Sequence, residues 1–111
     1  MELTDLSLLA VNRVRADRAH EFEEFLRMRL LPATRKAQPE LTSRWRAYSA
    51  GTEDGIAVYV FAFEGGRPED WQLEPVLKEA LGEAEAGRIL AEMDELLVEE
   101  QTGWELTALD L

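Results

Sequence analysis

The sequence predicts an α+β domain in which four antiparallel strands and two helical regions follow in the order strand, helix, strand, strand, helix, strand. Two segments predict buried strands. Ile56 to Glu64 begins with eight apolar residues, is rich in β-branched and aromatic side chains, and contains no glycine or proline. Leu6 to Arg15 is also mostly apolar, with Asn12 and Arg13 near its end. After each of these segments, apolar residues recur at helical spacing.

The first helical region is expected to begin at Asp17, a plausible N-cap residue. Its apolar side chains recur at helical spacing, and charged residues fill the remaining surface. These apolar residues are Phe22, Phe25, Leu26, Leu30 and Ala33. Because proline lacks the N–H that a helix interior needs, we expect a kink or a restart at Pro32 and the end of the helix before Pro39.

The middle of the chain predicts a β-hairpin. Thr42 to Ser49 alternates between polar and apolar residues, so we expect a strand that is polar on one face and lies near an edge of the sheet. The five residues Gly51 to Gly55 are expected to form the loop that leads into the strand at Ile56.

The second helical region is expected to open at Pro68 with a short turn that carries Trp71, and to restart at Glu74. Gly82 then separates two apolar stripes, so two helical pieces are predicted there. Alternation from Trp104 to Leu111 predicts the last strand.

This order of elements is the ferredoxin-like βαββαβ arrangement, in which the first and third strands lie in the middle of the sheet and both helices cover one face. Side chains alternate along the third strand, so Ile56, Val58, Val60 and Ala62 line one face and Ala57, Tyr59, Phe61 and Phe63 line the other. Two helices cover only one face. We expect the aromatic face to be the uncovered one, and a second copy of the chain to cover it in a homodimer.

Composition limits the classes of partner. The 111 residues predict one domain, 1–111, and the formal net charge of −11 disfavours nucleic acid and anionic membrane surfaces. No apolar run is long enough to predict a membrane span. The absence of cysteine excludes disulfides and thiolate metal sites and is consistent with a cytoplasmic protein.

Several segments together resemble a known superfamily. They are Asn12 and Arg13 near the end of the first strand, Leu31, Pro32 and Ala33 in the helix, Pro39, Glu40 and Leu41 before the second strand, and the strand from Tyr59 to Glu64 followed by Trp71. The chain resembles the dimeric α/β-barrel superfamily, which includes antibiotic-biosynthesis monooxygenase-like and stress-responsive barrel domains, although Glu40 stands where that family often has glycine. The resemblance implies two subunits that pack sheet against sheet around a lumen for a small, often aromatic, molecule.

Asn12 is the candidate catalytic residue. The resemblance places it where cofactor-free monooxygenases of the superfamily use an asparagine near the substrate, and an amide there could polarise a carbonyl group or hold a peroxide. The alternative is a structural asparagine at the end of a strand that bonds to neighbouring backbone.

The remaining candidates are for ligand binding. Aromatic side chains expected at the lumen are Tyr59, Phe61, Phe63 and Trp71, and a polar strand face that could bind an anionic or phenolic ligand, or form a solvated edge or salt bridges between subunits, carries Arg44, Arg46 and Tyr48. His20 is the only histidine, which excludes a His-pair metal site. We expect no metal and no cofactor.

Two functions remain open from the sequence. The leading hypothesis is a homodimer that binds a small, mostly apolar or aromatic molecule and, if it is an enzyme, carries out cofactor-independent oxygenation or isomerisation of an aromatic or polyketide-like substrate. The alternative is a non-catalytic interaction module whose aromatic sheet face only mediates dimerisation. A cavity lined by the candidate residues would favour the first hypothesis, and a filled interface would favour the second. Ligand sensing by a transcriptional regulator is disfavoured because the acidic chain has no DNA-reading segment.

Overall fold

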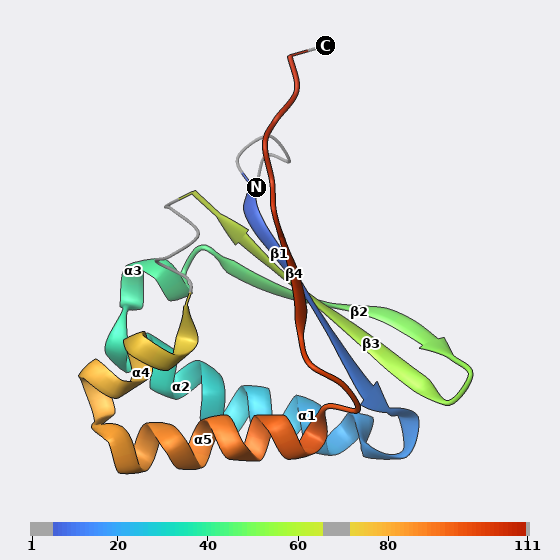
Figure 1. The fold of residues 1–111 in the computed structure, drawn as a ribbon, viewed down its shortest axis with the longest axis horizontal. Coiled ribbons are helices and arrows are strands. Elements are labelled where there is room, and N and C mark those ends of the chain that lie inside the picture. Colours follow the sequence, from blue (N-terminus) through green and yellow to red (C-terminus); the bar gives the residue numbers. More distant parts are fainter. Residues whose placement is uncertain (1–5, 66–71, 111) are drawn as a thin grey trace.

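The computed structural model describes residues 6–65 and 72–110 and has the predicted α+β architecture (Figure 1). One antiparallel sheet has the strand order β2-β3-β1-β4. Its strands are β1 (Leu6–Arg15), β2 (Trp45–Glu53), β3 (Ile56–Glu64) and β4 (Thr102–Glu105). The two most apolar strands therefore lie in the centre, and β2 lies at an edge, as the sequence predicts.

The helices lie together on one face of the sheet (Figure 1). The first helical region comprises η2 (Ala16–Arg18), α1 (Ala19–Phe25), η3 (Leu26–Leu30), α2 (Leu31–Ala37) and α3 (Pro39–Thr42). The second comprises α4 (Leu73–Leu81) and α5 (Glu83–Leu96). The expectations for Pro68 and Trp71 lie outside the described residues.

Proline positions explain how the first helical region is divided. A π-helical turn, η3, precedes α2, which restarts with Pro32 in its first turn, where a missing N–H is tolerated. Gln38 then adopts an extended conformation before Pro39, and α2 ends. Both expectations are confirmed. Asp17 is not an N-cap; it lies inside η2 and forms an ion pair with Arg15 at 2.6 Å.

The β2–β3 hairpin is tighter than expected. Strand β2 continues to Glu53, so the turn contains only Asp54 and Gly55, both with positive φ, as in the hairpin turns that match strand twist. Gly51, at φ +96°, lies in a register shift within β2 instead of in a loop. The predicted start of this strand was also wrong, because Thr42 ends α3.

The C-terminal half follows the predicted order, with a shorter last strand. Gly82, at φ +87°, separates α4 from α5. Strand β4 pairs with β1 only from Thr102 to Glu105, and a further hydrogen bond of 2.9 Å joins the Leu106 N–H to the Ser7 carbonyl oxygen. Residues 107–110 belong to no helix or strand.

The aromatic face of β3 packs under the helices. Ala57, Tyr59, Phe61 and Phe63 are all at most 5% exposed, and the rings of Tyr59 and Phe22 of α1 lie 4.9 Å apart. The expectation that this face is uncovered was therefore wrong. Large rings fill the space between a sheet and its helices, and here the helices contribute matching aromatic and aliphatic side chains to the same core.

The uncovered face is the aliphatic one. Ile56, Val58 and Val60 are only partly buried there, and Tyr48 of β2 and Trp104 of β4 are 51% and 53% exposed. The register places Tyr48 beside Val60 and Trp104 beside Leu9, so these side chains share one surface, which we call the outer face. The outer face therefore exposes several neighbouring apolar side chains, whereas the apolar residues on the surface of a monomer usually occur singly.

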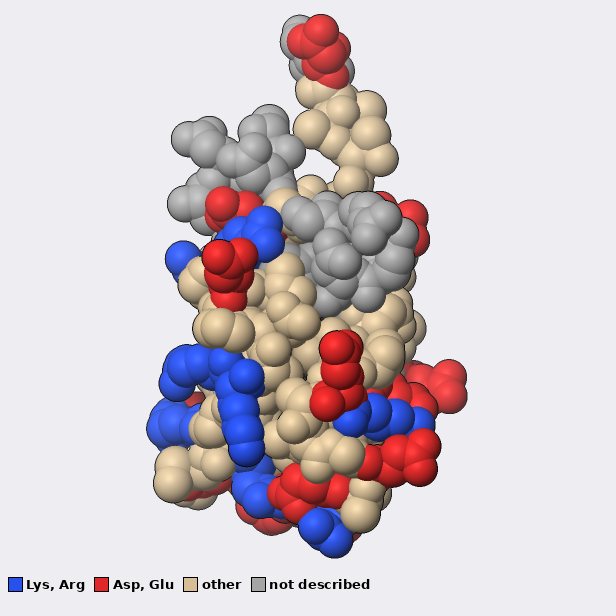
Figure 2. All heavy atoms as spheres, turned by 90° about the vertical axis from the view of Figure 1, so that its left-hand side faces the viewer, with Lys and Arg blue, Asp and Glu red and all other residues tan. Residues whose placement is uncertain are grey.

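Charged side chains coat the helices. Figure 2 shows basic and acidic side chains interspersed over one side of the molecule. Ion pairs within or between helices include Arg29 with Glu92 at 3.2 Å and Lys78 with Glu74 at 2.8 Å. Exposed pairs of this kind contribute little to the stability of the fold, because water screens them. Within the described part of the chain, no helix has the length and apolar character needed to cross a membrane.

Candidate functional site

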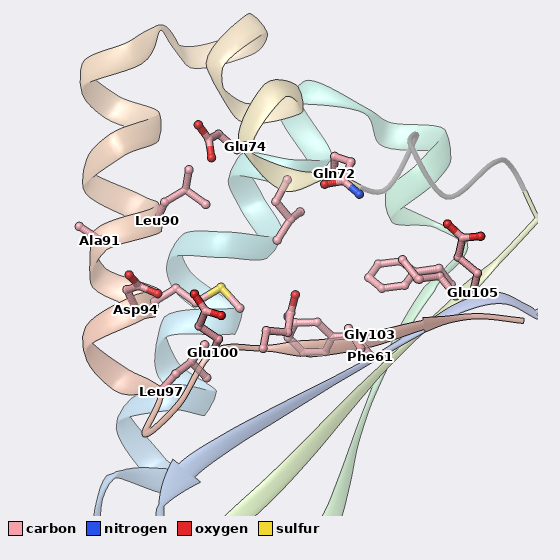
Figure 3. A pocket seen from close by; sticks show the side chains of 16 residues that line it. Phe61, Gln72, Glu74, Leu90, Ala91, Asp94, Leu97, Glu100, Gly103 and Glu105 are labelled. Carbon is pink, nitrogen blue, oxygen red and sulfur yellow. The ribbon is translucent and has the colours of Figure 1, made fainter.

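A pocket of about 820 Å³ lies between the inner face of the sheet and helices α4 and α5 (Figure 3). Central strands supply its floor and the two helices supply its walls. The apolar residues that line it are Leu8, Ala10, Phe61, Phe63, Leu73, Leu90, Ala91, Met93 and Leu97. A pocket of this size that combines an apolar floor with polar side chains is typical of sites for small organic molecules.

A pair of side-chain amides lies at the edge of this pocket. Asn12 of β1 has no exposed surface, and its Nδ2 donates a hydrogen bond of 3.3 Å to the backbone oxygen of Tyr59. Gln101 lines the pocket, and its Nε2 donates a hydrogen bond of 2.7 Å to Oδ1 of Asn12. Asn12 thus bonds to neighbouring backbone, as expected for a structural asparagine, and it also accepts a hydrogen bond from Gln101 in the pocket wall. Its catalytic role stays a prediction.

Tyr59 does not line this pocket. Its hydroxyl group donates a 2.7 Å hydrogen bond to Oε2 of Glu23 and lies 3.4 Å from the backbone oxygen of Ala19. Burial raises the pKa of Tyr59 to about 12, and the hydrogen bond and the charge of Glu23 add to this. A second hollow, of about 270 Å³, is lined by Tyr59, Glu23, Arg27 and Tyr48 at the β2 edge.

The predicted ligand-binding residues do not gather at one site. Phe61 and Phe63 line the main pocket, whereas Arg46 and Tyr48 belong to the outer face. Arg44 precedes β2, and its backbone oxygen accepts a hydrogen bond from the Glu64 N–H. The cause is the register, which pairs Trp45 with Phe63 and so places its neighbours Arg44 and Arg46 away from the inner face. Trp71 lies outside the described residues.

Sequence reasoning missed most of the pocket wall. Leu90, Met93 and Leu97 were recognised only as an apolar helical stripe, and Gln101 was not a candidate. The stripe carried a signal for burial, but nothing local indicates that α5 leaves space above the sheet. Nothing in the sequence around Gln101 indicates that its side chain reaches Asn12.

Metal ligands are not clustered in the part of the chain that the structure describes, where no group of three or more His, Asp or Glu side chains could hold an ion. His20 is 87% exposed and lies 3.9 Å from Glu24 on the same helix. Among the described residues, His20 therefore has no neighbouring set of ligands with which it could bind a catalytic metal.

The similarity of this chain to known proteins lies in its structure. No family model and no curated protein matches this chain. Among solved structures, a monooxygenase of Streptomyces coelicolor in complex with Nanaomycin D aligns with 14% identity and a TM-score of 0.54, over 96% of this chain and 91% of that chain. The chain has the fold of an antibiotic-biosynthesis monooxygenase. A Caulobacter crescentus protein assigned to those monooxygenases supports this with 20% identity and a TM-score of 0.51, over 97% and 95% of the two chains.

The antibiotic-biosynthesis monooxygenase fold confirms the resemblance inferred from the sequence, and at these identities it establishes the fold alone. It agrees with the observed element order and the four-stranded antiparallel sheet. The alternative of a module whose aromatic sheet face only mediates dimerisation was wrong in its choice of face, since Phe61 and Phe63 lie under the helices of their own chain.

Proposed function

We propose that this chain binds a small, mostly apolar organic molecule in the pocket between the sheet and α5. The observation that carries the proposal is the cavity itself, about 820 Å³ with Phe61 and Phe63 on its floor and an amide, Gln101, in its wall. Such a site can bury an apolar ring system and offers polar side chains at its rim to orient it. A monooxygenase of the same fold, solved with Nanaomycin D, also supports a ligand of this kind.

The reaction that fits this site best is oxygenation of an aromatic or polyketide-like compound without a cofactor. In such a reaction the substrate supplies the electrons: one dihydroxynaphthalene and one O₂ give one hydroxynaphthoquinone and one water. The chain would contribute an apolar floor for the rings of the substrate, and amides that hold a carbonyl oxygen or a peroxide. For Asn12 to touch the substrate, Gln101 has to release its oxygen, because Asn12 has no exposed surface. Isomerisation of a similar substrate would use the same contacts.

The proposal includes a homodimer in which a second copy covers the outer face. The support is the exposed apolar surface there, made by the partly buried β3 residues Val58 and Val60 together with Tyr48 and Trp104. Sheet-to-sheet packing would bury these side chains and close a barrel around them. In this arrangement each pocket lies on the helical side of its own sheet, away from the dimer interface.

Ligand binding is tested with N-phenyl-1-naphthylamine, a neutral probe that fluoresces in apolar surroundings. We expect saturable binding to the wild type and at least about tenfold weaker binding to Leu90→Trp, whose indole would fill the pocket. Ala84→Trp, at an exposed position of the same helix, is the matched control and should bind as the wild type does. Equal binding to all three proteins would refute this pocket as the site.

Oxygenation is tested by O₂ consumption and quinone absorbance with a dihydroxynaphthalene. If the wild type oxidises it and Asn12→Ala does so equally well, Asn12 has no catalytic role. A dimer that binds the probe but oxidises nothing in a panel of hydroxylated naphthalenes and anthracenes would favour a binding protein over an oxygenase.

A further inference from the structure

Four of the six polar side chains that line the pocket are carboxylates, and the other two are amides. Carboxylates enter its lining from several elements, namely Glu74 of α4, Asp94 of α5, Glu100 after α5 and Glu105 of β4 (Figure 3). Among the described residues that line it there is no Lys, Arg or His. An anionic rim without a cation repels a negatively charged ligand and attracts a positively charged one.

Only one of these carboxylates is paired with a cation from the described part of the chain. Glu74 forms an ion pair of 2.8 Å with Lys78, which also holds the pKa of Glu74 below its ordinary value. No ion pair within residues 6–65 and 72–110 involves Asp94, Glu100 or Glu105. All three are exposed, so they act on a ligand at the mouth of the pocket while its apolar part lies on the floor.

The hydrogen bonds of Asn12 determine how the amide group of Gln101 is oriented. The backbone oxygen of Tyr59 only accepts hydrogen bonds, so the Asn12 group that faces it is the NH₂. Oδ1 of Asn12 therefore faces Gln101, whose NH₂ must be the donor at 2.7 Å. The amide oxygen of Gln101 is the group of this side chain that is not used in the bond to Asn12, so it can accept a hydrogen bond from a ligand in the pocket. Gln72, the other amide in the lining, is exposed at the N-terminal end of α4.

We propose that this pocket selects molecules in which an apolar ring system carries a protonated amine. The ring system would pack on the partly exposed side chains of Leu73, Leu90 and Leu97, above the buried Phe61 and Phe63, and the ammonium group would meet the carboxylates and the oxygen of Gln101. A carboxylated analogue would be repelled by the same groups. This inference rests on the proposed function, because it names the class of ligand for the same pocket.

The test compares three naphthalene probes that differ in one group: 2-naphthylmethylamine, 2-naphthalenemethanol and 2-naphthoate. Each competes with N-phenyl-1-naphthylamine for the wild-type protein at pH 7 and low salt. We expect the amine to bind about tenfold more tightly than the naphthoate, with the alcohol between them, and the difference to shrink in high salt.

Two triple variants test whether a preference for the amine comes from the carboxylates of the pocket or from the net charge of the whole chain. In the pocket variant, Asp94→Asn, Glu100→Gln and Glu105→Gln remove the unpaired rim charges without changing side-chain size. In the control, Glu40→Gln, Glu53→Gln and Glu79→Gln remove the same charge from exposed positions that do not line the pocket. The preference for the amine should fall to about twofold or less in the first protein and persist in the second.

The outcomes distinguish this inference from the function on which it rests. Equal binding of the three probes, or tighter binding of the naphthoate, would overturn the amine preference and leave the pocket as a ligand site. Loss of the preference in both triple variants would assign it to net charge and overturn it as well. If none of the probes displaces N-phenyl-1-naphthylamine, and that probe itself does not bind, both proposals fail.

Discussion

Replacing Phe61 by alanine tests which face of the sheet its own helices cover. Phe61 has no exposed surface, and its ring lies 5.0 Å from Trp45 and 6.4 Å from Phe63. Removal of a fully buried phenylalanine costs about 3 to 5 kcal/mol, which is a large part of the roughly 5 to 15 kcal/mol that stabilise a domain. The variant should therefore be much less stable than the wild type.

Val60→Ala is the matched control on the opposite face of the same strand. Val60 is only partly buried in the single chain, so the loss of its two methyl groups should cost about 1 kcal/mol. The expected difference between the two variants is therefore about 2 to 4 kcal/mol.

Urea unfolding followed by tryptophan fluorescence measures both free energies of unfolding, because Trp45 packs against Phe61 and reports on this part of the core. The protein concentration should be low, so that association through the outer face does not add to the cost at Val60. A Phe61→Ala variant that loses no more stability than Val60→Ala would refute the assignment of the aromatic face to the helices.

Three further predictions concern the outer face, the amide pair and the buried phenol. Val58→Glu should convert the proposed dimer to a folded monomer in sedimentation experiments, whereas Ala84→Glu on the exposed side of α5 should leave assembly unchanged. Asn12→Ala should lower the free energy of unfolding by about 1 to 3 kcal/mol, because it leaves the buried backbone oxygen of Tyr59 without this donor. Gln101→Ala changes an exposed residue and should cost less than half of that. Equal losses in the two variants would contradict the role of this hydrogen bond. Burial raises the pKa of Tyr59 to about 12 from 10.0, so the folded state holds this proton more tightly than the unfolded state; the resulting stability is full below pH 10 and is lost as the pH rises towards 12. Tyr59→Phe should lose less stability than the wild type over that interval, and parallel losses would show that the phenol does not contribute.

The order of the elements was predictable because local chemistry decides it. Glycine and proline often end a helix when they follow an apolar periodic segment, as Gly82 and Pro39 do here. A continuous apolar run such as Ile56 to Glu64 forms a central strand. The turn at Asp54 and Gly55 was available to the same reasoning, since Asp-Gly favours two positive φ values, but the neighbouring Gly51 suggested a longer loop.

The covered face was not predictable from alternation alone. Alternation separates Val58 and Val60 from Phe61 and Phe63, but both sets are apolar, and a strand carries no mark of the side on which its helices pack. The signal lay in the partner element: Phe22 of α1 provides a ring that meets Tyr59, and large rings on both layers fill a sheet-to-helix interface well.

The candidate site was predictable only in part. Phe61 and Phe63 line the pocket because they belong to the strand that the sequence singles out. Gln101 and Leu90 join them through the separation between α5 and the sheet, which is a property of the whole packed domain and not of either segment.

The π-helical turn η3 gives the first helical region a place where one residue can be lost without a change of phase. Each residue of an α-helix advances the chain by about 100° around the axis, and the wider turn absorbs one residue that a regular helix would not. Deletion of Met28, which is 64% exposed, would remove little contact yet let the backbone close into regular turns. Because the lost residue is the one that the wide turn absorbed, the segment after it would keep its phase, and Leu30 and Ala33 would still face the core. The same deletion in the regular helix α5 would rotate the following residues by about 100° and turn its buried side chains away from the sheet.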